Sequence, residues 1–111
     1  MNLWLRSLAA IGAIAFLLGL FLGGSQSAAA SWVSPPWDKL VHFIAYGAFT
    51  ALLWVSFGGR RPWLGFGMAV LVGALDETMQ SALPMRVADP VDFLADATAA
   101  LLVTVCMRGF R

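Results

Sequence analysis

The run LWLRSLAAIGAIAFLLGLFLG, residues 3–23, holds a single charged side chain, Arg6, among apolar and small residues. At a rise of about 1.5 Å per residue, a helix of this length reaches about 31 Å, close to the thickness of the hydrocarbon core of a bilayer. Lipid offers backbone N–H and C=O groups no partners of its own, so the run should be helical. It therefore predicts a membrane-crossing helix.

The same stretch has a second interpretation, as a cleaved signal peptide. Arg6 precedes an apolar stretch over residues 8–22, and residues 28–30 are three alanines of the kind found at cleavage sites. A single arginine makes a weak basic region, however, and the apolar stretch is long enough to span. We therefore favour a retained helix.

The composition of the whole chain excludes a soluble domain. Of its 111 residues, 60% are hydrophobic and 12% are charged, with a mean hydropathy of +0.82, whereas soluble domains carry about 25% charged residues. The net charge of +1 says nothing about nucleic acid, but the absence of a basic run or an aromatic–basic patch excludes nucleic-acid binding. The one cysteine, Cys106, forms no intrachain disulfide and is interpreted as a small buried apolar residue.

Three further apolar segments lie at about residues 39–57, 63–82 and 90–107, separated by stretches rich in glycine, proline and polar residues. Each is near the length of a tilted crossing helix. The expected fold is therefore an all-α, integral membrane four-helix bundle that forms one domain over residues 1–111.

Lysine and arginine predict the orientation. With four crossings and a cytoplasmic N-terminus, only Lys39 and Arg86 lie outside. The five basic residues inside are Arg6, Arg60, Arg61, Arg108 and Arg111. This asymmetry follows the positive-inside rule, so we expect a bacterial cytoplasmic (inner) membrane protein with both termini in the cytoplasm.

The carboxylates are more one-sided than the basic residues, which lie on both sides of the membrane in this orientation. All fall towards the outer side, although acids contribute little to topology. The six are Asp38, Asp76, Glu77, Asp89, Asp92 and Asp96.

The second segment places Asp38, His42 and Tyr46 at intervals of four, so they share one helix face, with Lys39 at its border. Asp38 also suits the first turn of a helix, where a carboxylate caps open N–H groups. A histidine on an apolar face is often only a hydrogen-bonded structural residue. Here it shares its face with an acid and a phenol, which keeps a functional role open.

In the third segment, the thirteen residues from 63 to 75 reach only about 20 Å. A crossing must therefore include Asp76, Glu77 and Gln80, and ionisable groups at that depth cost at least a few kcal/mol unless they are paired or wetted. A structural salt bridge or hydrogen-bond network is the simpler alternative to a functional site.

The fourth segment begins with Asp89, Pro90 and Asp92, a sequence typical of a capped helix start. Capping does not explain Asp96, one turn deeper on the same face. Below Asp96 this face continues with residues that indicate close helix packing. They are Ala99, Ala100 and Val103.

Three segments thus bring ionisable groups to a similar depth, and we expect a polar, partly wet pocket that opens outwards. His42, Glu77 and Asp96 should point into it, with Asp76 or Gln80 on its wall. Arg86, in the loop before the fourth segment, is suited to a carboxylate or phosphate and alternatively pairs with a loop acid.

The combined pattern resembles the VanZ-like family of bacterial membrane proteins, which is named for an accessory protein of teicoplanin resistance. The resemblance covers residues 38–102. Three differences from the family pattern are Asp96 for a usual asparagine, Ala99 near a common glycine, and Met85 before the arginine. The matching residues are Asp38, Lys39, His42, Phe43, Tyr46, Asp76, Glu77, Gln80, Arg86 and Asp92. The resemblance implies a multi-span cell-envelope protein, with a bearing on glycopeptide susceptibility, and supplies no reaction.

The favoured function is a non-enzymatic envelope factor whose pocket binds a polar or cationic group, such as part of a lipid-linked cell-wall precursor or a glycopeptide. The alternative is a membrane-embedded enzyme acting on an envelope lipid or cell-wall intermediate, with acid/base groups or a divalent metal. Its candidate metal ligands would be Asp38, His42, Glu77 and Asp96. No HExxH motif, nucleophile elbow or phosphate loop supports catalysis.

Ion-coupled transport and a purely structural role are the remaining classes. Transport is disfavoured because the inner halves of the predicted spans lack ionisable residues, and packing alone does not explain six acids on one side. We predict no cofactor and no resident metal, membrane lipid as the neighbour, no nucleic-acid partner, and room for oligomers.

Overall fold

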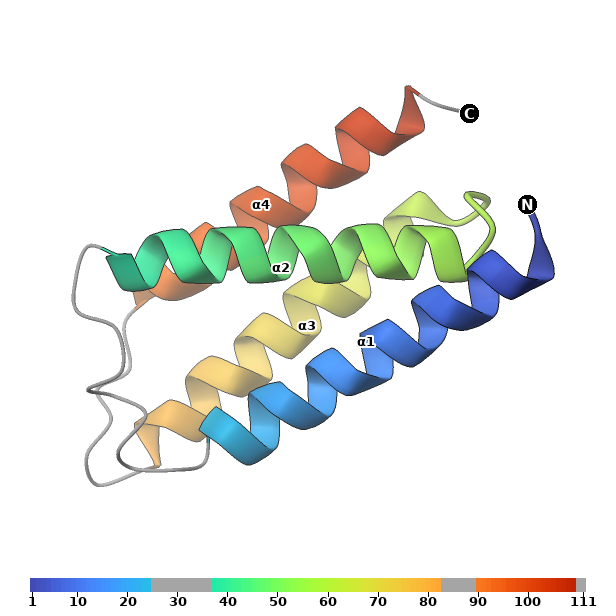
Figure 1. Cartoon of the computed structure of the whole chain (residues 1–111). Coiled ribbons are helices and arrows are strands. Elements are labelled where there is room, and N and C mark those ends of the chain that lie inside the picture. Colours follow the sequence, from blue (N-terminus) through green and yellow to red (C-terminus); the bar gives the residue numbers. More distant parts are fainter. Residues whose placement is uncertain (25–36, 83–89, 110–111) are drawn as a thin grey trace.

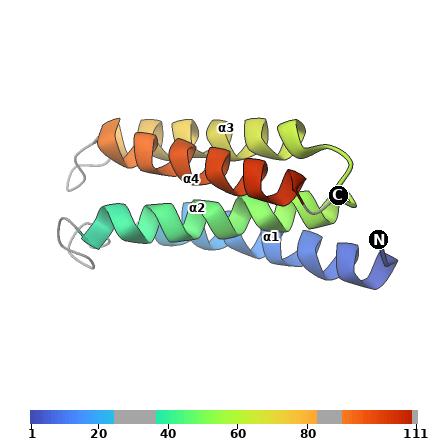
Figure 2. The ribbon, with the colours of Figure 1, turned by 90° about the horizontal axis from the view of Figure 1, so that it is seen from above.

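The computed structural model describes residues 1–24, 37–82 and 90–109, which form four α-helices and no strand. Their bounds lie within two residues of the four predicted segments. The helices are α1 (Leu3–Gly24), α2 (Trp37–Ser56), α3 (Pro62–Ser81) and α4 (Pro90–Arg108). Consecutive helices run in opposite directions, so α1 begins and α4 ends at the same end of a bundle 43 Å long (Figures 1 and 2).

Three helices, α1, α2 and α4, are long and apolar enough to cross a membrane by length and composition. Large apolar side chains cover much of the outside of the bundle, among them Leu18 on α1 and Leu102 on α4. A surface of this kind suits lipid rather than water. The fold is thus the expected all-α membrane bundle.

Helix α3 is outside that apolar group. It has 20 residues, as α2 does, but its last two turns carry Asp76, Glu77 and Gln80. The predicted crossing by α3, and with it the number of spans, therefore stays a prediction.

The most extensive packing joins α2 to α4, and α4 also packs along α3. Among the described residues α1 packs mainly on α2 and makes no contact with α4. Small residues allow the α2–α4 approach, because a Cβ on Gly47 would lie 3.4 Å from Val103 and 3.9 Å from Ala99. Ala99 and Ala100 are fully buried, which confirms the predicted inward face of α4. The core cluster is formed by Ala13, Phe49, Leu53, Ala69 and Ala100.

A tight hairpin joins α2 to α3. Gly58 and Gly59 adopt φ values of 68° and 74°, a left-handed conformation that glycine adopts without strain. A Cβ on Gly59 would also lie 3.0 Å from the Trp54 ring, so space as well as conformation requires glycine there. Pro62 then begins α3 at a position where its missing N–H has no consequence.

Some sequence expectations fall outside the described residues. They are the loop over residues 25–36 with its alanine cleavage site, Arg86, Asp89 and Arg111. One expectation was wrong: Cys106 is exposed on the outside of α4, because its position lies away from the face that packs on α2 and α3. An apolar position in a lipid-facing helix need not be buried by protein.

Candidate functional site

The site begins with a histidine held between two carboxylates where α2 crosses α4. His42 Nδ1 lies 2.8 Å from Asp96 Oδ1, in hydrogen-bond contact, and His42 Nε2 lies 3.8 Å from Asp92 Oδ2. Asp92 and Asp96 are one turn apart on α4, so both face the same ring. An ionised Asp96 only accepts hydrogen bonds, which places a hydrogen on Nδ1.

Lys39 extends this contact towards the start of α2. Its Nζ lies 3.0 Å from Asp38 Oδ2 and 3.2 Å from Asp92 Oδ1. Asp92 is therefore shared by Lys39 and His42. Asp38 lies in the first turn of α2, as expected, and pairs there with Lys39.

Helix α3 supplies a second buried polar pair. Gln80 Nε2 donates a hydrogen bond to Asp76 Oδ2 at 3.1 Å, and both side chains are buried. The two residues are four apart, so they lie on one face of α3. Glu77 follows on the neighbouring face and is half-buried.

Asp96 connects the two polar groups. A Cβ on Gly73 would be 3.2 Å from Asp96 Oδ2 and 3.4 Å from Asp96 Cβ, so Asp96 lies directly against the backbone of α3. Gly73 and Asp76 are three residues apart, which puts the Asp96 contact and the Asp76–Gln80 pair on the same face of α3.

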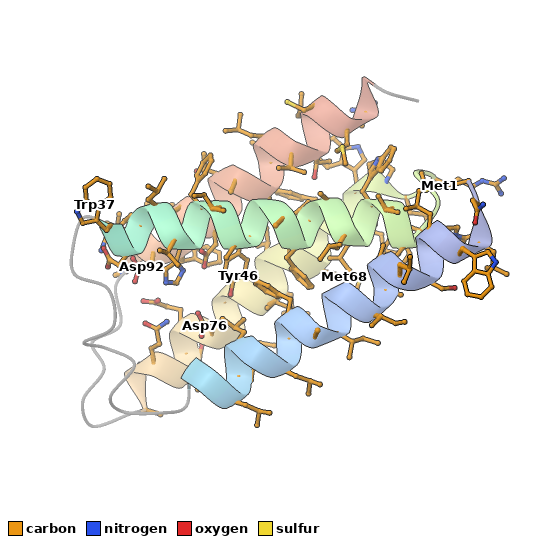
Figure 3. All side chains as sticks on the ribbon, viewed as in Figure 1. Met1, Trp37, Tyr46, Met68, Asp76 and Asp92 are labelled. Atoms are coloured by element: carbon orange, nitrogen blue, oxygen red, sulfur yellow. The ribbon has the colours of Figure 1, made fainter. Side chains whose placement is uncertain are left out.

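Tyr46 lies one turn beyond His42 and is buried in the bundle. Its ring is parallel to that of His42, with centroids 6.1 Å apart and an interplanar angle of 3°, and Phe16 of α1 meets it edge-on at 5.5 Å. Side chains on a helix lean towards its N-terminus, and Tyr46 lies on the side of α2 that faces Asp76 of α3 (Figure 3). Among the described residues the buried Tyr46 hydroxyl has no hydrogen-bond partner.

These residues occupy one end of the bundle, where α2 and α4 begin and α3 ends (Figures 1 and 3); we call it the acidic end. Its described carboxylates are Asp38, Asp76, Glu77, Asp92 and Asp96. The expected meeting of His42 with Asp96 is present, and Asp76 and Gln80 adjoin them. A direct role for Glu77 stays a prediction, and Arg86 lies outside the described residues.

Two residues at the site were not identified from the sequence. Gly73 permits the close contact between α3 and Asp96, and Phe16 covers the Tyr46 ring from α1. A glycine within a helix signals close approach, but nothing in the sequence says which partner approaches. For Phe16 we find no sequence signal.

The arrangement offers hydrogen-bond acceptors, one ammonium and one imidazole within a mostly apolar protein. Such a set can bind a polar group or move a proton between His42 and its neighbouring carboxylates. Within the described ranges no three His, Cys, Asp or Glu side chains are placed to hold a metal ion.

Comparison with known proteins agrees with the polar pattern of the bundle. The family model described as VanZ/LLP1 matches residues 4–111. No match was found among curated proteins or among solved structures. Since the matched region is essentially the whole chain, including α1, this protein belongs to the VanZ/LLP1 family.

Proposed function

We propose that this chain is a non-enzymatic, multi-span protein of the bacterial cytoplasmic membrane whose acidic end faces outwards and binds the polar group of an envelope ligand. A lipid-linked cell-wall precursor or a glycopeptide is the class of ligand that suits it. Both termini would then lie in the cytoplasm, beside the arginines.

The Tyr46 hydroxyl is the observation that carries this proposal. A buried hydroxyl without a partner costs about 1–3 kcal/mol, and among the described residues none satisfies it. The ring that carries it is parallel to that of His42, which contacts Asp96, and meets Phe16 edge-on. A structural network would use this hydroxyl, whereas a binding site keeps it for the ligand.

The charge at the acidic end supports the choice of ligand. Five described carboxylates lie there with one lysine and one histidine. Such a set favours a group that donates hydrogen bonds or carries positive charge, as amines and sugar hydroxyls do.

Tyr46→Phe tests the proposal because it removes the hydroxyl and leaves the ring contacts with His42 and Phe16. We expect thermal stability equal to or slightly above that of the wild type, together with loss of the co-purified polar ligand. The measurement is the melting temperature of the purified protein, with mass spectrometry of bound lipids. The variant should also fail to restore the envelope phenotype of a deletion strain, glycopeptide susceptibility included.

Thr50→Val is the matched control, since it removes another buried hydroxyl from α2. That hydroxyl donates to the Tyr46 carbonyl oxygen at 2.7 Å and is thus satisfied within the helix. Its loss should leave ligand content unchanged. If Tyr46→Phe lowered abundance, stability and ligand content together, the hydroxyl would belong to the scaffold and the proposal would fail.

A membrane-embedded acid/base enzyme is the second candidate, and the 2.8 Å contact between His42 and Asp96 favours it. A carboxylate that orients an imidazole is a common arrangement for proton transfer. The two functions differ in how their effect on the cell depends on the amount of this protein. Lowering expression tenfold should weaken a binding factor in proportion, whereas the product of an enzyme would continue to accumulate in the membrane lipids.

A further inference from the structure

The described arginines gather at the end of the bundle opposite the acidic end, around the hairpin between α2 and α3. We call it the arginine end. Its described members are Arg6, Arg60, Arg61 and Arg108. The described carboxylates all lie at the acidic end, so this end combines four positive charges with no described negative one.

Arg6 of α1 is fixed against the hairpin. Its Nε donates to the Ser56 carbonyl oxygen at 3.2 Å, near the C-terminus of α2. A Cβ on Gly58 would be 3.4 Å from the same nitrogen, so the guanidinium lies directly over the turn. This contact uses one donor, and within the part of the chain that the structure describes the two terminal nitrogens remain for other acceptors.

Arg108 is held on the other side of the same hairpin. Its guanidinium carbon lies 5.4 Å from the centre of the Trp63 ring, a cation–π contact. Trp63 follows Arg60, Arg61 and Pro62 directly in the sequence. The exposed Arg60 and Arg61 are therefore flanked in the sequence by Gly58, which Arg6 contacts, and by Trp63, which Arg108 contacts.

A hydrogen-bond donor under the hairpin has no described acceptor. The Trp54 ring packs against Gly59, and its buried Nε1–H has no hydrogen-bond partner among the described residues. The Trp54 donor, which has no described partner, is an observation independent of the number of arginines, and it too favours a hydrogen-bond acceptor at this end.

The neighbouring surface is that of a lipid contact. Trp4 and Trp63 are 79% and 48% exposed, which suits the head-group level of a bilayer. The apolar side chains Leu5 and Leu64 are exposed beside them, where acyl chains would lie. A guanidinium binds phosphate through paired N–H donors. An anionic lipid therefore suits the arginines through its phosphate and the neighbouring apolar side chains through its acyl chains.

We propose that the arginine end binds the phosphate of an anionic phospholipid, with Arg60 and Arg61 reaching the phosphate between the positioned Arg6 and Arg108. This site is separate from the proposed function, because it lies at the other end of a bundle 43 Å long. Lipid is favoured over free phosphate by the exposed tryptophans and leucines next to the arginines.

The test uses the purified full chain with equal amounts of phosphatidylglycerol and phosphatidylcholine of the same acyl chains. Native mass spectrometry counts the bound lipid, and melting temperature reports stabilisation by each. We expect the wild type to retain phosphatidylglycerol preferentially. Arg60→Gln with Arg61→Gln should weaken this retention by about fivefold for each arginine removed, the effect of one basic residue at an anionic surface.

Arg60→Lys with Arg61→Lys is the control that keeps the charge, and with it the signal for membrane insertion. It should stay closer to the wild type than the glutamine variant does. Equal retention of both lipids by the wild type would overturn the proposal, as would a glutamine variant that keeps phosphatidylglycerol like the wild type. Inorganic phosphate is the third probe. If it raised the melting temperature as much as phosphatidylglycerol, the ligand would be a soluble phosphate and the lipid assignment would be wrong.

Discussion

At the scale of single residues, the seam between α2 and α4 alternates basic and acidic groups. Lys39 pairs with Asp92, and His42 lies between Asp92 and Asp96. Each acid on α4 is thereby matched to a residue on α2. A change at one of these positions therefore alters a hydrogen bond and a charge together, and the two effects have to be separated.

Asp96→Asn and Asp96→Leu separate them. The asparagine carbonyl oxygen still accepts from His42 Nδ1 where the Asp96 carboxylate does so at 2.8 Å, so we expect stability within about 1 kcal/mol of the wild type. Leucine leaves the imidazole N–H without its acceptor and should cost about 1–3 kcal/mol. Unfolding of the purified protein in mixed detergent measures both. Equal losses for the two variants would show that charge attraction, rather than the hydrogen bond, holds the seam.

At the scale of elements, the contact of α3 with α4 depends on one position without a side chain. Gly73 brings the backbone of α3 against Asp96, and the next turns of α3 carry Asp76 and Gln80. Of the two other glycines in α3, Gly65 packs on Leu53, whereas Gly67 has nothing within 4 Å of the place a Cβ would occupy. Gly73 and Gly67 therefore make a matched pair of positions on one helix.

Gly73→Ala should therefore destabilise the protein relative to Gly67→Ala. In an open helical position alanine is favoured over glycine by about 1 kcal/mol, so Gly67→Ala should be neutral or stabilising. At position 73 the new methyl group meets Asp96 Oδ2 at 3.2 Å and displaces it, which offsets that gain and moves Asp96 relative to His42. Melting temperatures of the two variants measure the difference. A stabilised Gly73→Ala protein would mean that α3 and α4 separate without penalty.

The helices were predictable from the sequence, and their contacts only in part. Each apolar run ends in glycine, proline or polar residues, so its bounds follow from local physics. The spacing of His42 and Asp96 from the starts of their helices gave a shared depth, and the two do meet. Which helix Gly73 or Phe16 would touch depends on how four helices cross, and one sequence carries no record of that. That the Tyr46 hydroxyl has no partner among the described residues is a property of the assembled bundle for the same reason.

At the scale of the whole molecule, the two ends of the bundle carry opposite charge. The described acids lie where α2 and α4 begin, and the described arginines lie where α1 begins and α4 ends. Because consecutive helices run in opposite directions, this separation requires acids at the starts of α2 and α4 and at the end of α3, and arginines at the opposite ends of the helices. The polarity of the molecule therefore matches the proposed orientation in the membrane.

Reporter fusions test that orientation. Fusions after Ser34 and Leu83 should report the outer side, and a fusion after Gly59 should report the cytoplasm, because the arginines of the hairpin are retained there. An epitope tag at the N-terminus should persist on the mature protein if α1 is kept. An outer-side signal at Gly59 would require either a different number of crossings or the opposite orientation.

The pairing of α2 with α4 also has a consequence for biosynthesis. His42 and Asp96 are 54 residues apart, and translation delivers the earlier member first. When α2 leaves the ribosome, His42 has no α4 to contact, and the hydrocarbon interior disfavours an imidazole without its carboxylate partners. The nascent hairpin must therefore wait at the interface or beside the insertion machinery until Asp92 and Asp96 emerge. Full insertion becomes favourable only with the last helix, so a ribosome that stalls before α4 leaves a chain that quality-control proteases can recognise by its unburied polar face.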